Sequence, residues 1–409
     1  MLLIKNIGTL ATPQGNTARC GAEQGRIKEY KNAAVLISGS GVITAITENG
    51  KLPENAKNAE IIDACGALAT PGLVDAHTHL VFGGWRAHEV PLKISGASYL
   101  DILNAGGGIL NTLVNTRKAS EDELFERALL FLDEQAALGI TTVEIKSGYG
   151  LDRETELKQL RVIRRLNEVA AQDVVSTFLG AHAIPDEFKG NADGYIDYLI
   201  AEVLPEVAKE KLADFCDVFT ESSVFNVEQS RRILLAAQKL GLPSKIHADE
   251  IDPLGGSELA GEIGAVSAEH LIATRDSGIA AMAASKTIAC LLPQTSLYLG
   301  KPFARARDMI TAGVPVAIAT DFNPGSCPSL NLQLAMNLGY LKYRLYPGEI
   351  LTAVTLNAAC AIGMGEVIGS VEPGKQGDLV IWQADDIAML AYRMGSNQVK
   401  TVIKKGKIL

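Results

Sequence analysis

The feature that most constrains the fold is a regular alternation, between residues 66 and 357, of short apolar runs and longer amphipathic segments. The longer segments return apolar residues every three or four positions, as surface helices do, whereas the short runs are rich in β-branched residues, as buried strands are. Eight such runs occur, and they are LATPGLVDAH, TTVEIKS, VVSTFLGAH, FCDVFTES, SKIHADE, AVSAEHL, KTIACLL and PVAIATD. Eight β/α alternations are typical of a (β/α)8, or TIM, barrel rather than of a doubly wound sheet.

The two ends of the chain have a different texture. Residues 1–65 and the last part of the chain carry short alternating runs that are broken by glycine, asparagine and proline, which is typical of β-strands. Each end alone is too small to bury much core. We therefore expect an α/β protein in which residues 66–357 form the barrel, while residues 1–65 and 358–409 pack together as one small composite β-sandwich domain.

Charge and composition narrow the classes of partner. The net charge of -9 and the absence of any Lys/Arg-rich block argue against nucleic-acid binding. The six cysteines are scattered without CxxC pairs, which fits neither a disulfide framework nor a thiolate zinc site. No apolar run approaches the roughly 20 residues of a membrane span, and the opening run is too short for a signal peptide. We expect a cytoplasmic protein that acts on a small molecule.

Histidines mark one end of the predicted barrel. Five of the six lie where a predicted strand ends, and only His88 does not; the five are His77 and His79 after the first strand, His182 after the third, His247 after the fifth and His270 after the sixth. Side chains two residues apart on a strand share a face, so the first two can hold one ion together. Because the strands of a barrel open on one mouth, all five should converge there.

Two acids extend this pattern, since Glu250 follows His247 by three residues and Asp321 ends the eighth strand. Each has a simpler interpretation: Asp321 as a turn or helix-cap residue, Glu250 as a helix-start carboxylate. Similarly, His270 could tie down a loop. Taken jointly, neutral imidazoles and a carboxylate are ligands suited to zinc or iron rather than to calcium or magnesium. We expect one metal ion held by His77, His79, His247 and Asp321, with a position left for an activated water.

Whole motifs carry a family resemblance. PGLVDAHTH, the histidine in HADE, the histidine in SAEH and the aspartate after the eighth strand resemble the amidohydrolase superfamily. No lysine stands at the tip of the fourth strand, FCDVFTES, where the binuclear members of the superfamily carry a bridging lysine. In this respect the chain resembles the mononuclear branch. Within that branch the chain is similar over nearly its whole length to the imidazolonepropionases of histidine degradation, through FGGWRAHE, KSGYGL, FLGAHAIP, KIHADEI, SAEHL and ATDFNPGS.

This resemblance implies a hydrolase that opens the ring C–N bond of 4-imidazolone-5-propanoate to give N-formimino-L-glutamate. It implies one Zn²⁺ or iron ion (Fe³⁺ or Fe²⁺) per chain and a homodimer. The substrate-binding residues that it implies are Arg86, Tyr149, His182, Glu250, Asn323, Gly325 and Ser326. The planar fork of an arginine suits the propanoate carboxylate. In isolation, Arg86 could be a surface charge, and Tyr149 and Asn323 could be turn residues.

The catalytic roles expected from this resemblance fall to four residues. Asp321 accepts a proton from the attacking water, His270 orients that water, and Glu250 carries a proton to the leaving ring nitrogen, with His182 as the fourth catalytic group. Two alternatives stay open. A guanine or cytosine aminohydrolase of the same branch would release ammonia, and a noncatalytic barrel would act as a binding scaffold.

Overall fold

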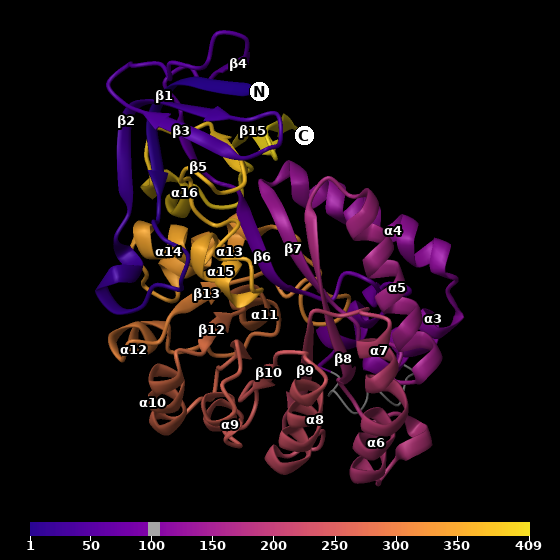
Figure 1. The fold of residues 1–409 in the computed structure, drawn as a ribbon. Helices are drawn as coiled ribbons and strands as arrows, with labels where there is room; N and C mark the ends of the chain where they lie inside the picture. Colours follow the sequence, from indigo (N-terminus) through magenta and orange to yellow (C-terminus); the bar gives the residue numbers. More distant parts are fainter. Residues whose placement is uncertain (97–106) are drawn as a thin grey trace.

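The barrel is present and nearly closed. A computed structural model describes residues 1–96 and 107–409, in which eight parallel strands follow one another around a single sheet in chain order (Figure 1). These strands are β6 (Leu73–Thr78), β7 (Ile140–Lys146), β8 (Asp173–Ala181), β9 (Phe215–Thr220), β10 (Lys245–Ala248), β11 (Ser267–His270), β12 (Ile288–Leu291) and β13 (Val316–Ile318). A parallel bridge between Thr78 and Phe322 brings the segment after β13 back to β6. The predicted (β/α)8 architecture is confirmed.

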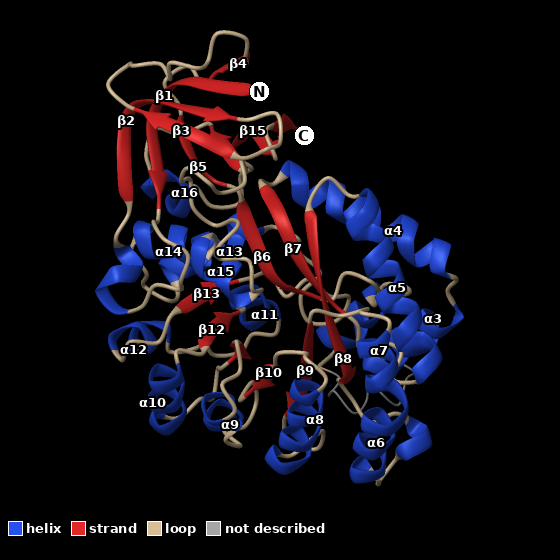
Figure 2. Cartoon of the chain, viewed as in Figure 1, coloured by secondary structure: helices blue, strands red, loops and turns tan. Residues whose placement is uncertain are grey.

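Helices surround the barrel on its outer side (Figure 2). Those that follow the barrel strands or lie between them are α1 (Val90–Ile94), α3 (Gly108–Lys118), α4 (Glu121–Ala137), α5 (Arg153–Val169), α6 (Ala192–Tyr198), α7 (Leu204–Lys209), α8 (Val227–Lys239), α9 (Gly256–Glu262), α10 (Asp276–Ser285), α11 (Pro293–Tyr298), α12 (Ala306–Thr311), α13 (Leu332–Leu341), α14 (Pro347–Ala353) and α15 (Leu356–Ala361). In α5 the buried residues Leu157, Leu160 and Ile163 recur every three residues and face the barrel. Ser120 and Glu123 form a capping box that starts α4.

Strands from both ends of the chain form a second sheet. Its order is β16-β15-β14-β5-β1-β2-β3, with β4 also paired to β1. The bounds are β1 (Leu2–Thr12), β2 (Lys28–Ile37), β3 (Ile43–Thr47), β4 (Glu60–Asp63), β5 (Leu68–Pro71), β14 (Leu379–Trp382), β15 (Val399–Lys404) and β16 (Lys407–Ile408), and α16 (Ile387–Tyr392) lies between β14 and β15. Ile4, Ile37, Leu379 and Ile403 share one buried cluster, so the two ends of the chain build a common core. The expected second unit from both termini is confirmed.

The first predicted strand is divided between the two units. Leu68–Pro71 is β5, which pairs with β1 and β14 of the terminal sheet, whereas β6 begins only at Leu73 and belongs to the barrel. Gly72 lies at the junction, and a Cβ there would come within 2.3 Å of the Thr141 hydroxyl oxygen. Only glycine permits this close approach of the chain to β7. Both halves are completely buried, so burial does not reveal the junction.

The expected domain boundaries, 1–65 with 358–409 and 66–357, stay a proposal. β5 falls in the barrel range of that division while pairing with the terminal sheet, and α15 crosses its second boundary. Part of the interval 81–120, which we expected to hold loops and a helix over the barrel mouth, lies outside the described residues; the rest contains α1 and α3. Among the described residues, no helix is both long and apolar enough to cross a membrane.

A partly buried ion-pair group joins the two units. Lys404 of β15 lies 2.7 Å from carboxylate oxygens of both Asp173 and Asp378, and Lys405 lies 2.6 Å from Asp173. Burial alone would raise the pKa of Asp173, but the two lysines hold it below its ordinary value of 3.8. The start of β8 is therefore anchored electrostatically to the C-terminal strands.

Replacing Asp173 with Asn should lower the free energy of unfolding by about 1.5–3 kcal/mol at pH 7, since charge-assisted hydrogen bonds are lost. A carboxyl whose folded pKa is lowered stabilises above its unfolded pKa, and that contribution is lost as pH falls through the folded value. The difference in free energy of unfolding between the wild type and the variant should therefore stay constant from pH 7 to about 5 and shrink below pH 3.8. Urea unfolding across this range measures it, and a difference that grows on acidification would contradict the assignment.

Candidate metal centre

The histidines predicted to mark the strand ends lie together at one mouth of the barrel. His77 is in β6, His79 follows it, His182 follows β8, His247 is in β10 and His270 is the last residue of β11. Their rings are neighbours, with centroids of His77 and His247 4.7 Å apart and those of His247 and His270 5.2 Å apart. The remaining histidine, His88, is exposed and lies in a short 3-10 turn, Ala87–Glu89.

The four residues expected to bind a metal converge. One nitrogen from each of His77, His79 and His247 lies within 4.8 Å of the others. Asp321 Oδ1 lies 3.5 Å from His77 Nε2 and 3.6 Å from His79 Nε2. Ligand atoms of His77, Asp321 and His270 also lie within 4.8 Å of one another, so His270 lies beside the proposed ligands.

The chemistry of this donor set fits a cation. His77, His79, His247 and Asp321 are almost completely buried, and the Nε2 atoms of His77 and His247 have no hydrogen-bond partner among the described residues. Burial is the main reason that the pKa values of His77 and His79 fall well below 6.5, which leaves neutral imidazoles with free lone pairs. Unpartnered buried nitrogens are costly unless a ligand satisfies them. These residues would hold a metal ion.

Unusual backbone conformations position two of these side chains. Asp321 and His270 have φ values of +59° and +67°, in the left-handed region that residues other than glycine seldom adopt. The Asp321 N–H donates to the carbonyl of His77 at 3.0 Å, and its Oδ2 accepts from the Thr295 hydroxyl at 2.5 Å. Strained backbone of this kind persists only where the surroundings hold it, and it gathers at functional sites.

Glu250 and His270 lie close to each other beside the candidate centre. Glu250 Oε2 lies 3.7 Å from His270 Nε2. Burial raises the pKa of Glu250, and burial lowers the pKa of His270 to about 4. A carboxyl whose pKa moves toward neutrality is suited to donate and accept protons during turnover. Asp321 also has a pKa raised by burial.

Tyr149 and His182 line the next part of the mouth. The His182 ring stacks on His79 with centroids 5.0 Å apart and lies 5.4 Å from the Tyr149 ring. His182 Nδ1 is 3.0 Å from the carbonyl oxygen of Gly148, which leaves Nε2 for a ligand. Burial lowers the pKa of His182 to about 3 and raises that of Tyr149, so both side chains are neutral hydrogen-bonding groups.

Arg86 is held against the loop that follows β13. Glu89, which is completely buried, accepts from Arg86 Nε at 2.7 Å and from Nη2 at 3.1 Å. A Cβ on Gly325 would lie 2.1 Å from Arg86 Nη1, so glycine is required for the arginine to occupy this place. Two elements expected to bind the substrate, which are far apart along the chain, are thereby brought together.

Asn323 shapes that loop. Its Oδ1 accepts from the backbone N–H groups of Gly325 at 2.9 Å and Ser326 at 2.7 Å, and its Nδ2 donates to the Asp321 carbonyl at 2.7 Å. The turn role that we considered for Asn323 is therefore real, and it connects the substrate-binding residues expected in this loop to Asp321. All of the expected site residues thus lie around one mouth of the barrel.

Five charged residues inside the barrel were not among those expected from the sequence. They are Glu144 and Lys146 of β7, Asp217 of β9, Lys245 of β10 and Glu269 of β11. Glu269 and Asp217 lie 3.0 Å from Nδ1 of His77 and of His247, respectively. A signal was present, because Lys245 stands two residues before His247 and charged residues interrupt otherwise apolar strands.

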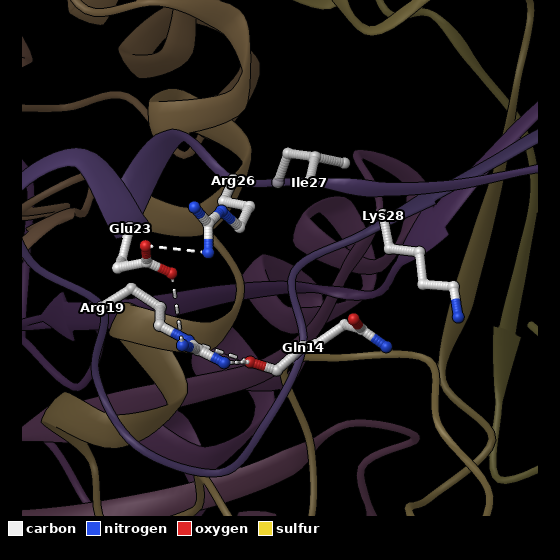
Figure 3. A pocket seen from close by; sticks show the side chains of 6 residues that line it. All are labelled: Gln14, Arg19, Glu23, Arg26, Ile27 and Lys28. Carbon is white, nitrogen blue, oxygen red and sulfur yellow. Dashed lines mark hydrogen bonds and ion pairs between the residues drawn. The ribbon is translucent and has the colours of Figure 1, made fainter.

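A separate hollow lies at the connection between β1 and β2. It has a volume of about 250 Å³ and is lined by Gln14, Arg19, Glu23, Arg26, Ile27 and Lys28 (Figure 3). Glu23 lies between the two arginines, 2.9 Å from Arg26 Nη1 and 3.9 Å from Arg19 Nη1. No imidazole or thiol lines it, so it lacks the chemistry that the barrel mouth has.

Comparison with known proteins agrees with this geometry. Residues 68–409 match the sequence profile described as the Amidohydrolase family. Imidazolonepropionase of Bacillus velezensis is 50% identical over 406 residues, which cover 99% of this chain and 96% of the relative. Imidazolonepropionase of Thermoanaerobacter pseudethanolicus is 48% identical over 403 residues, with 98% and 96% covered.

A solved structure supports the fold. The 5-methylcytosine deaminase from Klebsiella pneumoniae, liganded with phosphonocytosine, superposes with a TM-score of 0.74 and covers 98% of this chain and 97% of its own. Its sequence identity to this chain is 20%, so the likeness bears on architecture alone.

Proposed function

This chain belongs to the amidohydrolase family and, within it, to the imidazolonepropionases, and from that membership we propose that it hydrolyses the ring C–N bond of 4-imidazolone-5-propanoate to give N-formimino-L-glutamate in histidine degradation. The observation that carries this proposal is the 50% identity over 99% of the chain to a relative with this name. The buried cluster of imidazoles and Asp321 at the barrel mouth supports it, because ring hydrolysis at neutral pH requires an activated water.

The proposed ligands are His77, His79, His247 and Asp321. A zinc or iron ion bound there would lower the pKa of a water and polarise the ring carbonyl. Asp321, whose pKa is raised by burial, is suited to accept the proton that the attacking water loses. Hydrolysis must also protonate the ring nitrogen as its bond to the carbonyl carbon breaks, or the leaving group would depart as an unstable anion.

We assign that second proton transfer to Glu250, whose burial raises its pKa. His270, 3.7 Å from Glu250, is assigned the role of orienting the water. His182 and Tyr149 are neutral donors and acceptors that would hold the imidazolone ring above them. Glu250 is thus assigned to proton transfer, His270 to orienting the water, and His182 and Tyr149 to substrate positioning.

The propanoate carboxylate is assigned to Arg86 and to the loop containing Asn323, Gly325 and Ser326. Glu89 occupies two of the guanidinium nitrogens of Arg86 and leaves Nη1 beside Gly325. An anionic group bound here would receive a fixed N–H donor from the arginine. A neutral purine or pyrimidine base carries no carboxylate that this arginine could bind.

The function is tested by incubating metal-replete protein with freshly prepared 4-imidazolone-5-propanoate. We expect loss of the ring absorbance with equal appearance of N-formimino-L-glutamate and no release of ammonia. Ammonia released from guanine or cytosine, without ring opening of the imidazolone, would instead support an aminohydrolase. No turnover of any of these compounds by protein that holds its metal would overturn the proposal.

Arg86→Met should raise KM much more than it lowers kcat. The lost charge-assisted hydrogen bond corresponds to about 1.5–3 kcal/mol, or roughly 10- to 150-fold in KM. Steady-state kinetics measures KM and kcat separately. Arg231→Met, on the outer helix α8, is the matched control. A variant that loses kcat with KM unchanged would remove Arg86 from carboxylate recognition.

Three further properties remain part of the proposal. Zinc and iron are both compatible with imidazole and carboxylate ligands, and we propose one such ion per chain. We also propose a cytoplasmic homodimer that binds neither nucleic acid nor membrane. Metal analysis of purified protein and light scattering during size-exclusion chromatography measure the ion content and the oligomeric state.

A further inference from the structure

Beneath the histidine cluster the barrel interior is charged. Glu144, Lys146, Asp217, Lys245 and Glu269 all have side chains with no solvent exposure. The interior of such a barrel is usually filled by branched apolar side chains. Burying charged groups in this position costs free energy unless they are paired, so we expect these residues to have a role beyond packing.

Glu269 contacts one proposed ligand. Its Oε2 lies 3.0 Å from His77 Nδ1 in a hydrogen bond, and its Oε1 accepts from the Ser267 hydroxyl at 2.5 Å and lies 3.5 Å from Lys245 Nζ. A carboxylate can only accept, so the ring proton of His77 is placed on Nδ1. Nε2 is then the free lone pair, and it faces Asp321 at 3.5 Å.

Asp217 lies beside a second proposed ligand, at ion-pair distance from its ring and in a hydrogen bond with its backbone. Its Oδ2 lies 3.0 Å from His247 Nδ1 and 2.9 Å from Lys146 Nζ, while its Oδ1 accepts from the backbone N–H of His247 at 3.1 Å. Lys146 also donates to Glu144 at 2.7 Å. Asp217 therefore contacts both the ring and the backbone of one histidine.

We propose that Glu269 and Asp217 are positioning residues of the metal centre, which direct Nε2 of His77 and His247 toward the ion, and that Lys245 and Lys146 hold these two carboxylates in place. This inference rests on the proposed function through its set of metal ligands. It adds two carboxylate–lysine pairs that the sequence motifs did not indicate. Removing a carboxylate that orients a metal-binding histidine typically weakens metal binding by about 10- to 100-fold.

The test compares metal affinity in variants that keep the shape of the side chain. Apoprotein of the wild type, Glu269→Gln and Asp217→Asn is titrated with Zn²⁺ and Co²⁺ in competition with a chromophoric chelator, and the visible spectrum of the Co²⁺ form is recorded. We expect each variant to bind about 10- to 100-fold more weakly, with an altered Co²⁺ spectrum.

Glu349→Gln is the matched control, because Glu349 is a buried glutamate outside this cluster that accepts from Arg307 at 2.8 Å and 2.6 Å. It should lose stability and retain wild-type affinity and spectrum. Ser267→Ala, which removes one hydrogen bond to Glu269 and no charge, should fold readily and weaken binding by a smaller factor.

Folded variants that all bind both metals as tightly as the wild type, with an unchanged Co²⁺ spectrum, would overturn this inference alone. Wild-type metal content and ring-opening activity are measured on the same preparation. Wild-type protein that binds no metal would overturn the proposed function as well, so the two failures are distinguishable.

Discussion

Asp321→Asn is expected to reduce kcat/KM by on the order of 10⁴-fold, the upper range for loss of a proton-transfer group. The change removes a proposed metal ligand and the base that accepts the water's proton. Asparagine is the appropriate replacement, because Asp321 has a φ of +59° and asparagine tolerates the left-handed region better than most residues. Fold and backbone should therefore survive while activity is lost.

Steady-state kinetics and metal analysis on the same sample measure this effect. Asp214→Asn is the control, because Asp214 accepts from the Ser176 N–H at 2.9 Å just before β9 begins, at the opposite end of the barrel from Asp321. The control should keep near-normal turnover. An Asp321→Asn enzyme within tenfold of wild type would exclude Asp321 as the proton acceptor.

Glu250→Gln is expected to lower kcat by about 10²- to 10⁴-fold while metal content stays at the wild-type level. The glutamine amide would keep the shape of the side chain and could not deliver a proton to the leaving nitrogen. Because Glu250 is not a proposed ligand and lies 3.7 Å from His270, metal binding should not depend on its charge. Loss of metal together with activity would instead place Glu250 among the ligands.

The fall of the rate at higher pH checks the same residue. Burial raises the pKa of Glu250, so its protonation should fall within an accessible range of pH above 4.5. Because Glu250 must be protonated to donate, log kcat of the wild type should fall as pH rises through this titration, and in Glu250→Gln that limb should be absent. Glu349→Gln, which alters a buried glutamate paired with Arg307, should retain the wild-type profile.

The fold was predictable where the pattern is local. A strand of alternating or wholly apolar residues and a helix of period near 3.6 can each be read from neighbouring residues, and this was enough for eight strands and their order. The junction at Gly72 was not predictable, because Leu68–Pro71 and Leu73–Thr78 are equally buried while they belong to different sheets.

The candidate site divides in the same way. His77, His79, His247, His270 and Asp321 could be placed at one mouth because parallel strands of a barrel all end there. The contact of Glu269 with His77, 192 residues away, could not be predicted, since alternation assigns a residue to one face of a strand and not to a partner across the sheet. The same holds for Arg86, which meets Gly325 only in the folded chain.

By itself the sequence determined the type of barrel, the end of it that carries the chemistry, and the residue types available to bind a cation. Periodicity and chain order are enough for these, because both are properties of neighbouring residues and of the parallel topology. The tertiary structure alone decided which nitrogen of each histidine faces the ion and which buried charges stand behind it. Those choices depend on distances of about 3 Å between side chains from different strands, which only the packed barrel sets.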